Sequence, residues 1–174
     1  MKTTNILLIL LFISVTAAAQ PPQNRTEPMQ ALDFLKGTWK GSGWIMGKET
    51  RIPLASAELV QGKLNGNALL VEGIHRGRSL SGEQGAVLFE ALALVTYDPE
   101  TETYSWRSAT SEGRGGNFEA KVVGEETLHW GQENSFRYII TIDENGRWYE
   151  TGERTRDGGK TWHQFFEMTL EKQE

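Results

Sequence analysis

Three acidic side chains of this chain lie within otherwise apolar segments, where a carboxyl group could take part in acid–base chemistry. These residues are Glu72, Glu90 and Glu150. Glu72 lies between Leu70 and Ile74 in a two-residue alternation, so an inward-facing Glu72 would be desolvated and its pKa would rise. A pair such as Glu72 and Glu150 could then donate and accept protons in a buried site. The alternative is that these carboxylates occupy edge or outward positions, where they would do no chemistry.

An arginine shares a strand face with Glu150. In the alternation that follows residue 147, one face carries Trp148, Glu150, Gly152, Arg154 and Arg156, and the other face carries Tyr149, Thr151 and Glu153. If the first face lines an apolar interior, Glu150 and Arg154 must pair with each other and find further hydrogen bonds, because buried charges need partners. The same face could instead be outward, with Arg154 simply covering it.

The chain lacks several residue types and motifs that catalysis often uses. It has no cysteine and three histidines, His75, His129 and His163. A thiolate nucleophile, a disulfide, an iron–sulfur cluster and a cysteine zinc site are therefore excluded, and we expect no metal site. No G-x-S-x-G motif is present, so a nucleophile would have to be Ser or Thr with a distant histidine. His75 precedes a polar segment, 76–85, which could form the rim of a binding site or an ordinary connection.

Length and charge place the chain among single-domain proteins that do not bind nucleic acids. It has 174 residues, with 18 Lys and Arg against 23 Asp and Glu, which gives a formal charge of −5. A chain of ~150 residues already buries enough surface for one stable core. An acidic body offers no electrostatic footprint for a phosphate backbone, so we expect no nucleic-acid partner.

The N-terminus has the pattern of an export signal. Residues 1–19 carry one lysine, an apolar run over 6–15 and three final alanines, so we expect a signal peptide cleaved near Ala19/Gln20. The apolar run is shorter than the ~20 residues that a spanning helix needs, so we expect no membrane span. Residues 20–29 are polar and rich in proline, which is typical of a disordered leader. We therefore expect a periplasmic or secreted protein with one domain over residues 30–174.

That domain shows strand patterns almost throughout. A short helix is expected over 30–36, and ten later segments have strand character: 38–46, 55–64, 68–75, 88–97, 104–110, 117–123, 127–132, 136–143, 147–156 and 161–171. About ten strands separated by turn residues are typical of a sandwich or barrel. Residues 86–94 have competing helix propensity. We assign them to a strand because Thr96, Tyr97 and a hairpin turn follow at once.

Three tight turns connect these segments as consecutive hairpins. They begin at Asp98, Asp143 and Asp157, and aspartate can accept hydrogen bonds from backbone amides two residues on. Consecutive hairpins make an antiparallel meander, and closure into a barrel removes its exposed edges. The predicted fold class is therefore all-β, a single antiparallel up-and-down β-barrel of about ten strands with a short N-terminal helix.

The segment Phe34–Gly43 is similar to the opening of the calycin barrels, where a G-x-W motif joins a short helix to the first strand. Gly37 and Trp39 match that motif. Over roughly 30–172, the chain more closely resembles a bacterial lipocalin-like domain family of unknown function, whose members are often secreted. Three motifs in order carry this resemblance, at 34–39, 96–98 and 157–162. The resemblance implies that Trp39 plugs the closed end of a barrel, where its ring would bury a large apolar area.

Nitrobindin-type haem barrels, a related calycin group, have a similar G-T-W-x-G-x-G opening and a haem-ligating histidine near the last strand. Only His163 could match that histidine. In the expected alternation, Trp162, Gln164, Phe166, Met168 and Leu170 share the inward face. That alternation points His163 outward and argues against haem, so we expect no cofactor.

Together these patterns predict a barrel that binds a small apolar or amphipathic ligand in its lumen and does not catalyse a reaction. The expected lining residues are Glu72, Trp106, Glu150 and Arg154. Tryptophan and phenylalanine walls would desolvate the ligand, and one or two polar groups would orient it. Three alternatives remain open: a haem-binding nitrobindin-like barrel, an envelope interaction module with a filled lumen, and a small hydrolase or isomerase that uses lumen carboxylates.

Overall fold

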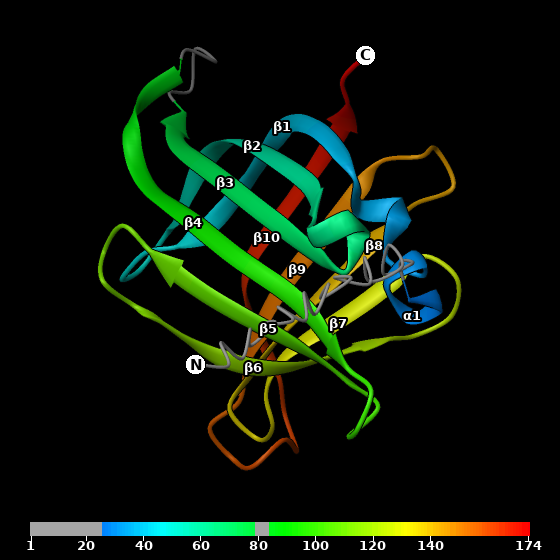
Figure 1. Cartoon of the computed structure of the whole chain (residues 1–174). Helices are drawn as coiled ribbons and strands as arrows, with labels where there is room; N and C mark the ends of the chain where they lie inside the picture. The colour runs from blue at the N-terminus through cyan, green and yellow to red at the C-terminus, as the bar shows by residue number, and fades with distance from the viewer. Residues whose placement is uncertain (1–25, 79–83) are drawn as a thin grey trace, which may run out of the picture.

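Ten strands form one closed antiparallel barrel in a computed structural model that describes residues 26–78 and 84–174 (Figure 1). Each strand pairs with its neighbours in sequence, and β1 closes the barrel by pairing with β10. The strands are β1 (Gly37–Met46), β2 (Arg51–Lys63), β3 (Ala68–Arg78), β4 (Gln84–Asp98), β5 (Thr103–Thr110), β6 (Gly115–Val122), β7 (Thr127–Gln132), β8 (Phe136–Ile142), β9 (Trp148–Arg154) and β10 (His163–Lys172). The predicted fold class is confirmed, and residues 86–94 are part of a strand.

The N-terminal helical segment begins earlier than predicted. Helix α1 (Glu27–Gln30) and the 3-10 turn η1 (Asp33–Leu35) precede β1, and a second 3-10 turn, η2 (Leu64–Gly66), joins β2 to β3. Met29 is buried, so the end of the expected leader is structured because its apolar side chain joins the core. The expected signal peptide, 1–19, and residues 20–25 of the leader lie outside the described residues.

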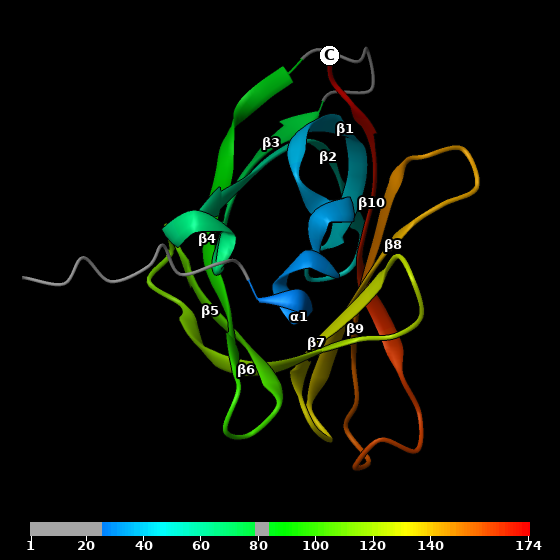
Figure 2. The ribbon, with the colours of Figure 1, turned by 45° about the vertical axis from the view of Figure 1, so that its right-hand side comes forward.

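One end of the barrel is closed by α1 and η1, which lie across it (Figure 2). Trp39 of β1 is 1% exposed, and its indole Nε1 donates a hydrogen bond to the carbonyl of Leu35 at 2.9 Å. The Trp39 ring meets Trp148 of β9 edge-on, with 5.7 Å between ring centroids. The Tyr104 hydroxyl donates to the carbonyl of Pro28 at 2.7 Å, which ties α1 to β5. Trp39 and Trp148 therefore form the floor of the barrel interior.

The aspartate turns have the expected hydrogen bonds. Each carboxylate accepts bonds from backbone amides of its own turn, all at 2.9 Å: Asp98 from Glu100, Asp143 from Asn145 and Arg147, and Asp157 from Thr161. These turns fix the hairpin registers, which in turn decide which side chains face the interior.

β10 departs from simple alternation. Its register against β9 shifts between Gln164 and Phe166, so Phe165 and Phe166 both line the interior. Gln164 instead bonds Glu167 at 2.9 Å. His163 pairs with Arg154 and therefore stands on the same face as that residue. The predicted common face for Gln164 and Phe166 was wrong because one extra residue reverses the alternation.

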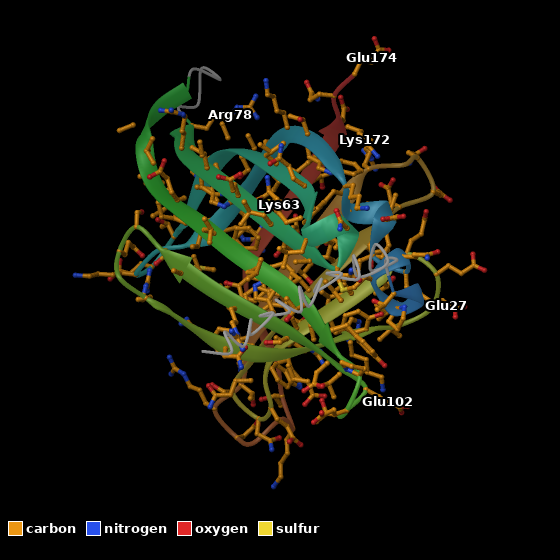
Figure 3. All side chains as sticks on the ribbon, in the orientation of Figure 1. Glu27, Lys63, Arg78, Glu102, Lys172 and Glu174 are labelled. Carbon is orange, nitrogen blue, oxygen red and sulfur yellow. The ribbon has the colours of Figure 1, made fainter. Side chains whose placement is uncertain are left out.

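The outer surface of the barrel carries charged side chains. Lys63, Glu102 and Lys172, labelled in Figure 3, are all exposed. Among residues 26–78 and 84–174, no helix has the length and apolar character required to cross a membrane.

Candidate functional site

The barrel encloses a cavity of about 810 Å³ to which every strand contributes. Trp148 lies at its closed end. The cavity extends to the loops at the end opposite α1, where Glu112, Arg114, Ser135 and Arg156 line it. The lumen is therefore hollow, and its mouth lies among the β5–β6, β7–β8 and β9–β10 loops.

An aromatic stack forms one wall of this cavity. Trp130 of β7 lies between Trp106 of β5 and Tyr138 of β8, with centroid distances of 4.8 Å and 4.3 Å and nearly parallel rings. Phe136 meets the Trp130 ring edge-on at 6.2 Å, and Phe118 meets Phe136 edge-on at 5.1 Å. Such a wall offers a large apolar surface of fixed shape, because stacked and edge-on rings restrain each other.

A polar cluster lies on the wall formed by β2 and β3. His75 is buried and uses both ring nitrogens: Nδ1 lies 3.0 Å from the Ser56 hydroxyl, and Nε2 lies 3.4 Å from Oε1 of Glu58. Phe89 stacks on the imidazole at 4.2 Å. A Cβ added to Gly73 would lie 2.7 Å from Oε1 of Glu58 and 3.0 Å from Nε2 of His75, so the missing side chain makes room for this contact.

Burial favours the uncharged forms of this cluster. Glu58 is 6% exposed, and desolvation together with the nearby charge of Glu150 raises its pKa well above the ordinary value. Desolvation lowers the pKa of His75 to about 4, so its imidazole is neutral at pH 7. Ser56, His75 and Glu58 thus form a continuous polar chain in which burial disfavours charge, and Glu58 and His75 line the cavity.

A second carboxyl group, Glu150, enters the cavity from β9. It is 7% exposed and accepts a hydrogen bond from Nε1 of Trp148 at 3.0 Å. Burial raises the pKa of Glu150 to about 8, although the Trp148 bond opposes the rise. Burial also raises the pKa of Tyr138, and the charge of Glu150 raises it further, so the carboxyl group lies within electrostatic reach of the aromatic stack.

Three of the four residues expected to line the lumen do so. Trp106, Glu150 and Arg154 line the cavity. Glu72 does not: it is half-buried between its cross-strand partners Leu59 and Leu92, on the outer face of β3. The reason is the alternation of β3, in which residues 71, 73 and 75 face inward. The carboxyl group that accompanies Glu150 in the lumen is therefore Glu58.

Sequence reasoning missed Ser56, Glu58 and the buried position of His75. In β2 the inward face carries Leu54, Ser56, Glu58 and Val60, and the outward face carries Ala55, Ala57 and Leu59. Because the outward face is the more uniformly apolar of the two, hydrophobicity alone indicates the wrong side. His75 was placed at a strand end, but β3 continues to Arg78 and encloses it. The only usable signal was the strict alternation from Leu54 to Val60.

The histidines of the described residues differ in their access to the cavity. Among them, His75 is the only histidine that lines the cavity, and both of its nitrogens are engaged. His163 is exposed at the rim and does not line the cavity. In the same part of the chain, no group of three or more histidine, cysteine, aspartate or glutamate side chains could hold a metal ion.

Comparison with known proteins establishes the fold and nothing finer. No family model matches the chain, and no curated protein matches it. Among solved structures, the crystal structure of Rv2717c from M. tuberculosis superposes with a TM-score of 0.62, covers 87% of this chain and 100% of its own, and is 13% identical. The chain therefore shares an antiparallel β-barrel fold with Rv2717c, and its resemblance to lipocalin-like and nitrobindin-type families stays a prediction.

Proposed function

We propose that this protein binds a small apolar or amphipathic ligand in the lumen of its barrel and catalyses no reaction. The observation that carries the proposal is the cavity of about 810 Å³, which is lined by an aromatic stack and holds Glu58, His75 and Glu150. Protein interiors are normally close-packed, and empty volume lowers stability. A barrel selected only for stability would fill this space with side chains, as the interaction-module alternative requires.

Binding would be driven by desolvation of the ligand against the aromatic wall. The stack of Trp106, Trp130 and Tyr138 supplies a rigid apolar wall for an apolar body. Burial raises the pKa of Glu150 to about 8, so its carboxyl group can donate as well as accept a hydrogen bond near neutral pH and orient a polar group of the ligand. Burial raises the pKa of Glu58 as well. Arg154 contacts the Phe165 ring, with 5.9 Å from its guanidinium carbon to the ring centroid, and adds a cation to the cavity wall.

A second candidate function is acid–base catalysis on a ligand held in the same cavity. It is favoured by the pKa of Glu150, which burial raises to about 8, because a carboxyl group that titrates near neutral pH can act as a general acid or base. Burial raises the pKa of Glu58 as well. Covalent catalysis by Ser56 is not supported, since that hydroxyl is buried and does not line the cavity. Turnover of a ligand by the wild type, lost in Glu150→Gln, would favour catalysis over simple binding.

The proposal also places the protein outside the cytoplasm, in the periplasm or secreted. The support is the sequence of residues 1–19, with its single lysine, apolar run and final alanines. Mass measurement of the protein purified from its own host should give a chain that begins at Gln20. A mature chain that retains residues 1–19 would contradict this part of the proposal.

A cavity-filling variant tests the binding proposal. Ser108 of β5 lines the cavity, whereas its neighbour Arg107 is exposed. We expect a panel of lipids and aromatic metabolites to include compounds that raise the Tm of the wild type and of Arg107→Trp, but not that of Ser108→Trp, whose indole would occupy the lumen. Equal shifts in both variants would place binding elsewhere, and no shift in the wild type would refute ligand binding.

A further inference from the structure

We propose that the lumen selects an organic cation, a small molecule in which a protonated amine is attached to an apolar or aromatic body. This inference rests on the proposed ligand binding and specifies the class of ligand. Two buried acidic side chains face a space walled by aromatic rings, and among the described residues no lysine or arginine forms an ion pair with either of them. The basic group beside Glu58 is the buried imidazole of His75.

The two carboxyl groups lie beside the tryptophan floor of the cavity. Glu58 is the cross-strand partner of Trp39, and Glu150 accepts a hydrogen bond from Trp148. Both line the cavity, and their charges interact. A ligand group that reaches the floor would therefore meet two carboxyl groups at once.

The groups that face these carboxyls come from four other parts of the barrel. They are His75 of β3, Tyr138 of β8, Arg154 and Arg156 at and just after the end of β9, and the Glu112–Arg114 pair of the β5–β6 loop. His75 and Tyr138 are uncharged at neutral pH. The three arginines are exposed at the mouth. Among the described residues, no lysine or arginine forms an ion pair with Glu58 or Glu150.

An isolated carboxylate is costly to bury, so in the empty cavity each acid is stabilised in its protonated form. A bound ammonium group changes that balance, because it can pair with a carboxylate in a desolvated site. The aromatic rings that line the cavity provide a second attraction for the same charge, since aromatic rings attract cations. A neutral or anionic head group would gain neither the ion pair nor the contact between the cation and a ring.

Such binding has a specific pH dependence. Below the pKa of Glu150, which is about 8, an ammonium group that pairs with its carboxylate must displace a proton. Binding therefore releases protons, and the Kd should fall by up to about tenfold for each pH unit between pH 6 and pH 8, because one proton is exchanged for one ligand. A ligand that accepts a hydrogen bond from protonated Glu150 would show the opposite dependence.

The test compares three probes that share one aromatic body: 1-naphthylmethylamine, 1-naphthalenemethanol and 1-naphthylacetate. Isothermal titration of the mature protein, at pH 6 and pH 8 and in two buffers with different ionisation enthalpies, measures affinity and proton release together. We expect the amine to bind at least tenfold more tightly than the alcohol at pH 8 and to release protons at pH 6. Glu150→Gln should weaken amine binding at least tenfold and remove most of its pH dependence, and it should weaken alcohol binding by a much smaller factor.

Two further variants keep the result interpretable. Glu58→Gln should weaken amine binding in the same way, and it replaces Glu150→Gln if circular dichroism shows that the latter does not fold. Glu72→Gln, on the outer face of the same barrel, should change nothing. If the alcohol or the carboxylate binds as tightly as the amine, the cation inference is overturned but ligand binding stands. If none of the three binds, the inference is overturned, and the cavity-filling comparison decides separately whether the lumen binds ligands at all.

Discussion

Replacement of Glu150 by glutamine should stabilise the protein at neutral pH and have little effect in mild acid. The folded protein keeps Glu150 protonated up to about pH 8, whereas a carboxyl group in the unfolded chain loses its proton near 4.5. Between these two values the folded state holds more protons than the unfolded state, so stability falls as the pH rises. Glutamine has nearly the same shape, carries no ionisable proton, and can still accept the bond from Trp148.

The size of this effect follows from the two pKa values. At 1.36 kcal/mol per pH unit, and with half-titration at each pKa, raising the pH from 4.5 to 7 costs the wild type about 3 kcal/mol, and raising it from 4.5 to 8 costs about 4 kcal/mol. Glu150→Gln avoids that cost. Relative to the wild type it should therefore gain about 3 kcal/mol in unfolding free energy between pH 4.5 and pH 7. For a domain of this size that gain is worth roughly 6–12 °C in Tm.

Urea unfolding followed by circular dichroism at pH 4.5, 6, 7 and 8 measures the gain. Glu72→Gln is the matched control, because it makes the same substitution at a half-buried carboxyl group on the outer face of the barrel, outside the cavity. A Glu150→Gln curve that runs parallel to the wild-type curve across this range would refute the reasoning. It would mean that Glu150 ionises as freely in the folded protein as in the unfolded chain.

Three other predictions concern the parts that shape the cavity. Gly73→Ala should lower the free energy of unfolding in urea by about 1–3 kcal/mol, because the Cβ of the alanine would overlap the Glu58 carboxyl group and the His75 ring. Wild-type stability together with unchanged imidazole NMR signals would contradict this account of Gly73. Trp39→Phe should lower the free energy of unfolding in urea by about 1–3 kcal/mol, since the buried Leu35 carbonyl loses its indole donor. A loss below about 0.5 kcal/mol would contradict the role given to Trp39 in the floor of the barrel. Asp157→Asn should lower the Tm at pH 7 but not at pH 2. Turn hydrogen bonds lower the pKa of Asp157 to about 2, and the stabilisation they give is lost as the pH falls through this value. An equal loss of Tm at both pH values would show that the charge of Asp157 is irrelevant to this turn.

The sequence predicted the barrel well because its signals are local. Alternation and aspartate turns are properties of short segments, and the turns at Asp98, Asp143 and Asp157 set the hairpins between strands β4 and β5, β8 and β9, and β9 and β10. The N-terminal boundary was less accurate, because the order around Met29 depends on burial against the distant barrel core.

The candidate site was predicted less well because it depends on which face of each strand turns inward. Period-two alternation divides a strand into two faces without saying which one is buried. On β9, Trp148 marked the inward face, and Glu150 and Arg154 followed from it. On β2 the small apolar residues Ala55 and Ala57 lie outside, so Glu58 was missed.

β10 shows a second reason why the inward face of a strand is hard to predict from sequence. The bulge at Phe165 reverses the alternation and leaves no compositional signal. The partnership of His75 with Ser56 and Glu58 depends on the register between β2 and β3, which pairs Ser56 directly with His75. A single sequence does not specify that register before the strands are aligned.

Native mass spectrometry of the mature protein, purified from the organism that makes it, tests the lumen-binding proposal most directly. The prediction is that the wild type and Arg107→Trp carry a bound small molecule, that Ser108→Trp does not, and that the released compound bears an amine. The same adduct on Ser108→Trp would contradict binding in the lumen. An unliganded mass for the wild type, with no change in Tm across the compound panel, would contradict ligand binding itself.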